Sequence, residues 1–154
     1  MNLDELEARW RAGHILTSQL SEIARELLAE GHDVPAVRSL AEAGESDAGE
    51  ARRTFERALR ELGRGGMNAS EAAMLLARGW AEQLLARRLS PRWATRAIAY
   101  VRFRGSADVD EALGPFTELE DEYHAVSQQA FARLRMLPLN RRARAEARRL
   151  VERG

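Results

Sequence analysis

The chain has 154 residues, of which 45% are hydrophobic and 31% are charged, and its formal net charge is zero. This mixture is typical of a folded globular protein and excludes a long disordered polypeptide. The absence of cysteine excludes disulfides, thiolate metal sites and cysteine nucleophiles. No apolar run approaches the about 18 residues of a membrane span, and the N-terminus MNLDELEARW is acidic. We therefore expect a cytoplasmic protein without a membrane partner.

Helical spacing of apolar residues begins at the N-terminus. The first apolar stripe extends from Leu3 to Leu27, with an expected interruption near Gly13. A short helix is expected from Pro35 to Ala43.

The stretch GESDAGEARRTFERALRELG at 44–63 carries clear helix signals. Asp47 and Glu50 have the three-residue spacing of a capping box, and Gly63 is a typical C-terminal stop. Charged residues cover the side opposite its apolar stripe, so we interpret this helix as structural.

Two further helices are predicted in the middle of the chain. One covers 68–89, and its apolar face comprises Met74, Leu75, Leu76, Trp80 and Leu84. The next covers 91–104, with Ser90 as its cap and proline at its first position. Asp108 and Glu111 are expected to cap a short turn.

The most regular apolar stripe follows Gly114-Pro115, which we expect to open a helix that reaches Leu137 and ends at Pro138. Its apolar residues are Phe116, Leu119, Tyr123, Val126, Ala130, Leu134 and Leu137. Asn140 is expected to cap a basic C-terminal helix at about 140–153.

These patterns contain no convincing strand. They predict an all-α fold: a compact bundle of about six to eight helices that forms a single domain over residues 1–154.

Charge is distributed in blocks along the chain, and all 24 basic residues are arginine. Residues 1–77 carry a formal charge of −5, residues 78–104 carry +6, residues 105–132 carry −7 and residues 133–154 carry +6. Either oppositely charged helices pair within the fold, or one block faces a partner of opposite charge.

The most acidic block provides the first candidate site. Its residues would form an acidic helical face that binds another protein, in particular a basic one; the alternative is a solvated face. The candidate residues are Asp108, Asp110, Glu111, Glu118, Asp121, Glu122 and His124.

A metal site is the weaker interpretation of the same block. Asp121 and His124 are three residues apart, which is half of the ligand set that a di-metal helical bundle uses. His14 and His32 have no acid three residues before them, so the second half is missing. We therefore predict neither a metal nor another cofactor.

Arginines alternate with aromatic residues in the segment 87–104, and arginines recur in the C-terminal helix. Such residues contact phosphates and stack on bases in nucleic-acid-binding proteins, although a chain of zero net charge lacks the general attraction to nucleic acid. The candidate residues are Arg88, Arg92, Trp93, Arg96, Tyr100, Arg141, Arg142, Arg148 and Arg149.

No motif of nucleophilic catalysis is present. None of the serines lies in a GxSxG motif, and GRGG at 63–66 lacks the Lys-Ser/Thr ending of a phosphate-binding loop. We predict no catalytic residue.

Two stretches resemble a group of small, uncharacterised, all-helical proteins from GC-rich actinobacteria. The first, at 27–63, combines a GxDxPAxRxLA segment with an acidic FERAL helix, and the second, at 85–124, joins a Ser-Pro-opened helix to a Pro-Phe helix rich in acids. The residues that match the first motif are Gly31, Asp33, Pro35, Ala36, Arg38, Leu40 and Ala41. The resemblance implies a helical fold and no established activity.

The sequence thus favours a non-enzymatic protein-interaction module. A sharper version is an immunity- or antitoxin-like inhibitor that presents its acidic face to a basic partner. The alternatives are a nucleic-acid-binding helical protein and a metal-dependent helical-bundle enzyme; a homo-oligomer is compatible with each of them.

Overall fold

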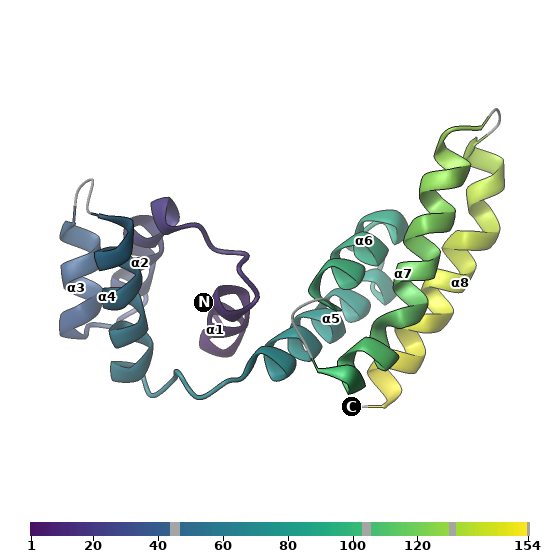
Figure 1. The fold of residues 1–154 in the computed structure, drawn as a ribbon. Helices are drawn as coiled ribbons and strands as arrows, with labels where there is room; N and C mark the ends of the chain where they lie inside the picture. Colours follow the sequence, from purple (N-terminus) through teal and green to yellow (C-terminus); the bar gives the residue numbers. More distant parts are fainter. Residues whose placement is uncertain (44–46, 103–105, 130–131, 154) are drawn as a thin grey trace. The chain divides into compact units, whose positions relative to one another are not determined.

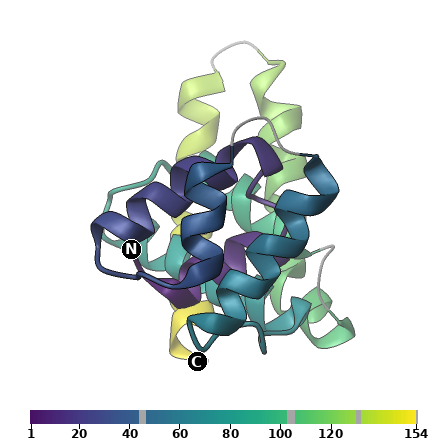
Figure 2. The ribbon, with the colours of Figure 1, turned by 90° about the vertical axis from the view of Figure 1, so that its left-hand side faces the viewer.

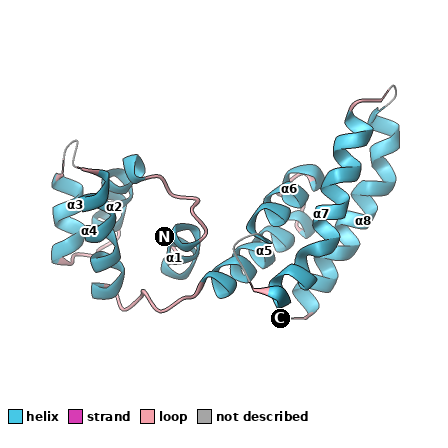
Figure 3. Ribbon diagram, viewed as in Figure 1, coloured by secondary structure: helices cyan, strands magenta, loops and turns pink. Residues whose placement is uncertain are grey.

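The fold was obtained as a computed structural model, which describes residues 1–43, 47–102, 106–129 and 132–153 (Figure 1). These ranges contain eight α-helices, one short 3₁₀ helix and no strand (Figure 3), which confirms the predicted all-α class. The elements are α1 (Leu3–Arg11), η1 (Thr17–Gln19), α2 (Leu20–Ala29), α3 (Pro35–Glu42), α4 (Ala48–Glu61), α5 (Ala69–Leu85), α6 (Pro91–Arg102), α7 (Ala107–Ser127) and α8 (Ala132–Glu152).

The residue contacts divide the chain into two compact units. Unit 1 is Met1–Asn68 and unit 2 is Ala69–Gly154. The boundary follows the glycine-rich turn at 63–66, and each unit has buried apolar residues of its own. The single domain over 1–154 stays a prediction from the sequence.

Unit 1 has an aromatic centre between α1 and α4. The rings of Trp10 and Phe55 meet edge to face with their centroids 4.8 Å apart, and the guanidinium of Arg52 lies 5.4 Å from the Trp10 ring. Helix α3 packs against both α2 and α4 (Figures 1 and 2). Their buried side chains include Leu20, Leu27, Val37, Leu40, Ala58 and Leu59.

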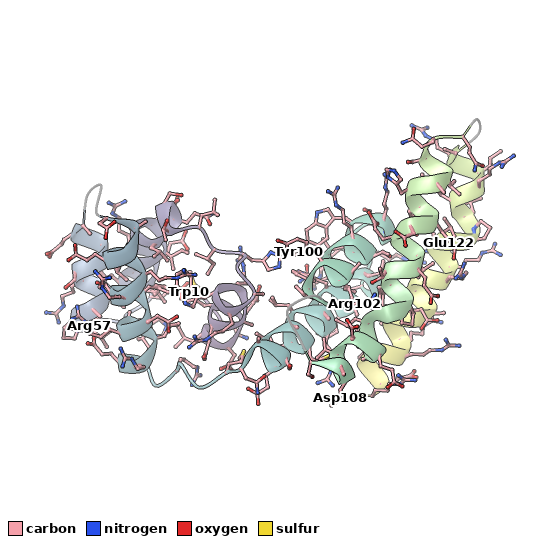
Figure 4. All side chains as sticks on the ribbon, viewed as in Figure 1. Trp10, Arg57, Tyr100, Arg102, Asp108 and Glu122 are labelled. Carbon is pink, nitrogen blue, oxygen red and sulfur yellow. The ribbon has the colours of Figure 1, made fainter. Side chains whose placement is uncertain are left out.

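A polar network joins α1 to α4 and to the end of unit 1. Glu7 is only 2% exposed, and its carboxylate accepts the backbone N–H of Met67 at 2.9 Å. Arg11 lies 3.7 Å from Glu7 and 3.3 Å from Glu56, and Glu56 accepts the indole N–H of Trp10 at 2.6 Å (Figure 4). The network compensates the buried charge of Glu7 with an arginine and a hydrogen bond.

Several local sequence signals act as expected in unit 1. Asp47 accepts the N–H of Glu50 and caps α4, and Gly13, with φ of 74°, separates α1 from the rest of the first apolar stripe. Helix α3 lacks a side-chain cap of its own. Instead, the Glu61 carboxylate of α4 accepts the N–H of Ala36 at 2.9 Å, so α4 supplies the missing cap.

Unit 2 contains α5 to α8. Helix α6 packs against α5 and α7, and α8 packs against α5 and α7 (Figure 1). The buried side chains are mostly alanine on α5 and larger on α7: Ala72, Ala73, Leu76, Ala77, Ala81, Leu84, Ala94, Thr95, Ile98, Ala99, Val101, Val109, Leu113, Phe116, Leu119, Tyr123, Leu139, Ala143, Ala147 and Leu150.

The predicted helix from Pro115 to Leu137 is wrong at both ends. Gly114-Pro115 lies inside α7, which begins at Ala107, and Pro138 lies inside α8, which begins at Ala132. Leu134 and Leu137 were expected on the buried stripe and are 67% and 53% exposed. The expected short turn at 108–111 is likewise part of α7.

Asn140 is not the cap of the last helix, because it lies inside α8. Its side-chain oxygen accepts the hydroxyl of Tyr123 at 2.7 Å. Tyr123 is fully buried. Burial raises the pKa of Tyr123 to about 12, with the nearby Glu120 acting in the same direction and Arg144 and Arg92 opposing it.

The backbone is strained just after the end of helix α5. The N–H of Arg88 donates to the carbonyl of Gln83 at 2.8 Å, and Arg87 between them has φ of 58°. This is the geometry of a Schellman C-cap, in which the left-handed residue is usually glycine. An L side chain there costs about 1 kcal/mol or more.

Replacement of Arg87 by glycine is therefore expected to stabilise unit 2. Arg87→Gly should raise the free energy of unfolding by about 0.5–1 kcal/mol, because glycine adopts positive φ without strain. Denaturant unfolding followed by circular dichroism measures the change. Arg88→Gly is the matched control and should give no gain, and an equal gain in both variants would contradict the explanation.

Removal of the Tyr123 hydroxyl is expected to change both stability and its dependence on pH. At neutral pH, Tyr123→Phe should lower the free energy of unfolding by about 1 kcal/mol, because Asn140 loses its donor. Because its pKa is raised in the fold, Tyr123 contributes stability that is fully present below the ordinary tyrosine pKa of about 10. This stability is lost as pH rises from there towards the folded pKa of about 12.

Unfolding midpoints measured between neutral pH and pH 11 test this expectation. The wild type should lose stability at the alkaline end and Tyr123→Phe should lose less. Tyr100→Phe is the control, since the Tyr100 side chain is half exposed. Parallel curves for the wild type and Tyr123→Phe would count against a buried phenol.

Candidate functional site

All residues predicted as candidate sites lie in unit 2, on three helices or, for Arg88, just before one of them. The acidic candidates lie on α7 and are called the acidic surface: Asp108, Asp110, Glu111, Glu118, Asp121, Glu122 and His124. The candidates on and just before α6 are called the aromatic–arginine surface: Arg88, Arg92, Trp93, Arg96 and Tyr100. The C-terminal candidates lie on α8: Arg141, Arg142, Arg148 and Arg149.

Part of the acidic surface is paired within unit 2. Arg102 of α6 donates to both carboxylate oxygens of Asp110, at 2.6 and 3.1 Å, and Arg142 of α8 contacts Glu122 at 2.5 Å (Figure 4). The hydrogen bond from Arg102 is the largest influence that lowers the pKa of Asp110 below its ordinary value. The alternating charge blocks therefore meet where α7 lies against its neighbours.

The rest of the acidic surface is exposed. Asp108, Glu111, Glu118 and Asp121 take no part in the ion pairs of the described residues, and His124 is also exposed. Within the same ranges, no three His, Asp or Glu side chains are placed to hold a metal ion.

The aromatic–arginine surface presents large side chains to solvent. Trp93 is 50% exposed and Tyr100 is 52% exposed. They are seven residues apart, so they lie on one face of α6, and Tyr100 extends from the side away from α7 (Figure 4). The Ser90 hydroxyl accepts the N–H of Trp93 at 3.3 Å, in agreement with the predicted cap of this helix.

Trp80 of α5 extends this surface. Its ring meets Trp93 edge to face, with centroids 6.0 Å apart and planes at 90°. Sequence reasoning missed this role because Trp80 continues the spacing of Leu76 and Leu84 and was assigned to the apolar face of its helix. Leu76 and Leu84 are buried, whereas Trp80 stays partly exposed.

The arginines of the aromatic–arginine surface are not neutralised. Arg88, Arg92 and Arg96 are exposed, and no ion pair between described residues includes them. Some of the candidate arginines on α8 are paired: Arg142 pairs with Glu122, and Arg149 pairs with Glu146 at 2.6 Å.

Unit 1 has a small depression of about 200 Å³ between α3 and α4. Its polar lining comes from Ser39, Glu50, Thr54 and Arg57. No candidate predicted from the sequence lies there. It contains no histidine and one carboxylate, so its lining alone does not provide an acid–base pair of carboxylates.

No protein-family model, curated protein or solved structure matches the chain. Within the described ranges, no helix is both long and apolar enough to cross a bilayer. The surfaces of unit 2 therefore have to be interpreted from their own chemistry.

The pairing of Asp110 with Arg102 has a measurable consequence. We expect the Asp110 carboxyl to titrate below its ordinary value of 3.8, because the hydrogen bond from Arg102 stabilises the ionised form. In Arg102→Gln the pKa of Asp110 should rise. Carboxyl ¹³C chemical shifts measured against pH test this, with the exposed Asp108 as internal reference; an unchanged Asp110 midpoint in the variant would refute the pairing.

Proposed function

We propose that the protein functions by binding another protein and that the aromatic–arginine surface of α6 makes the contact. The observation that supports this most is the half exposure of Trp93 and Tyr100 on one face of the helix. The ordinary solvent-facing helix surface is polar.

The residue types of this surface are those that contribute most to protein–protein binding. Tryptophan, tyrosine and arginine are enriched at the energetic centres of interfaces, because they bury a large area and also offer polar contacts. Trp93 is held from one side by the ring of Trp80. This contact restricts the indole before a partner arrives and lowers the entropy cost of binding.

A second version of the same function uses the acidic surface of α7. In this version the protein is an immunity- or antitoxin-like inhibitor, and its partner is basic. The exposed carboxylates of Asp108, Glu111, Glu118 and Asp121 support it, while the pairing of Asp110 and Glu122 with arginines reduces the charge available to a partner.

Nucleic-acid binding is the alternative from another class. The arginines and aromatics of α6 support it through phosphate contact and base stacking. It requires affinity that falls steeply with salt, which a shift assay on a labelled oligonucleotide measures directly.

Affinity capture distinguishes the two protein-binding versions. A partner that copurifies with the full chain should be lost from Trp93→Ala/Tyr100→Ala, with affinity reduced by about 100-fold, because each truncation at an interface centre costs 1–2 kcal/mol or more. It should be retained by Glu111→Gln/Glu118→Gln/Asp121→Asn.

The matched control is Leu134→Ala/Leu137→Ala, which truncates two exposed apolar side chains elsewhere in unit 2. Circular dichroism and unfolding midpoints verify that each variant is folded. Retention by the aromatic variant together with loss in the carboxylate variant would move the function to the acidic surface. Retention by both would refute the proposal.

A further inference from the structure

We infer that the aromatic–arginine surface binds an acidic segment of its partner, in which carboxylates flank an apolar side chain. The inference rests on the proposed function and adds the chemistry of the partner. It follows from the arrangement of the aromatic and charged side chains on α6.

The positions on α6 form two adjacent rows. Trp93 and Tyr100 define an aromatic row, and Arg92 and Arg96, one helical turn apart, define a row beside it. A ligand that lies along the helix therefore meets an apolar surface on one side and two guanidinium groups on the other. Carboxylates pair with such groups in a bidentate geometry.

The arginines of this surface lie in a stretch of the chain that has no acid of its own. The sequence contains no acidic residue between Glu82 and Asp108. Arg92 and Arg96 repel each other at the i,i+4 spacing, and neither belongs to an ion pair among the described residues. Elsewhere in unit 2, Arg102, Arg142 and Arg149 have carboxylate partners.

A short acidic segment fits this surface better than a nucleic acid does. Helix α6 has 12 residues and is therefore about 18 Å long. Its unpaired arginines lie in the first half, whereas Arg102 at the other end is already engaged by Asp110. The charge of Glu118 also acts on Arg102. The unpaired arginines therefore occupy a short stretch of one helix, which suits a segment with two or three acids better than a phosphate backbone, whose affinity depends on many such contacts.

Selection from a displayed library of random short peptides tests the inference on the full chain. Peptides enriched on the wild-type protein should carry Asp or Glu beside an aromatic residue or leucine. Their affinity should fall by about tenfold or more in Arg92→Glu/Arg96→Glu, because both favourable charge contacts become repulsive. Their affinity should also fall as salt increases.

The matched control is Arg141→Glu/Arg148→Glu, which reverses two exposed arginines on α8. This control should bind the selected peptides within about twofold of the wild type, because the effect of exposed charges is local at physiological salt. Equal losses in both charge-reversed proteins would indicate an effect of overall charge and would overturn the inference.

The remaining outcomes separate the inference from the proposed function. Enriched peptides that are neutral or basic, yet lost in Trp93→Ala/Tyr100→Ala, would overturn the inference and leave the proposed function standing. If the selected peptides bound equally well to the wild type, to Trp93→Ala/Tyr100→Ala and to Arg92→Glu/Arg96→Glu, the inference and the proposed function would both be overturned. The same holds if no peptide were enriched.

Two other ligands are examined with the same variants. Competition of an oligo-dT strand against the selected peptides at physiological salt would assign the surface to nucleic acid. Concentration-dependent dimerisation in light scattering, abolished by Arg92→Glu/Arg96→Glu, would assign it to the acidic surface of a second copy. Either result would overturn the inference of a separate acidic partner.

Discussion

The core of unit 2 combines small buried side chains, most of them on α5, with large buried side chains, most of them on α7. Helices α5 and α8 pack against each other, and four alanines of α5 and two of α8 are fully buried: Ala72, Ala73, Ala77, Ala81, Ala143 and Ala147. The distance between packed helices depends on the side chains at their contact, and interiors are densely filled. An indole has no place in such a contact. Trp80 and Trp93 pack on each other instead, and both side chains remain partly exposed.

The charge of unit 2 follows from the same arrangement. Because α7 packs between α6 and α8, its carboxylates reach an arginine on each of these helices, and Asp110 and Glu122 are paired in this way. In the part of the chain that the structure describes, no arginine in the first half of α6 forms an ion pair. The two interpretations of the charge blocks therefore apply to different residues: Arg102 and Arg142 pair with carboxylates of α7, while Arg92 and Arg96 form no ion pair between described residues.

Local signals predicted most of the helices. The error in the bounds of α7 and α8 came from a long-range feature. Asp47 and Ser90 act as caps because capping depends on residues within one turn. Between the end of α7 and the start of α8, the sequence has no proline or glycine at 128–131, and the apolar spacing continues through these positions. Gly114-Pro115 and Pro138, the only strong breakers nearby, lie inside helices instead. Packing against α5 and α6 outweighs the cost of an internal proline, because tertiary contacts dominate helix stability.

Apart from Trp80, the residues of the candidate surface were predictable, but their exposure was not. Tyr100 and Tyr123 both continue apolar helical spacing, so periodicity assigns both to a core. Tyr123 is accommodated in the core because the Asn140 side chain accepts a hydrogen bond from its hydroxyl. In the sequence, Asn140 was expected at the start of a helix. A buried phenol needs such an acceptor. Tyr100 instead remains half exposed beside Trp93 and Arg96. Which aromatic side chains are buried and which are exposed thus depends on contacts between helices. The alternation of arginines and aromatic residues in the sequence does not reveal these contacts.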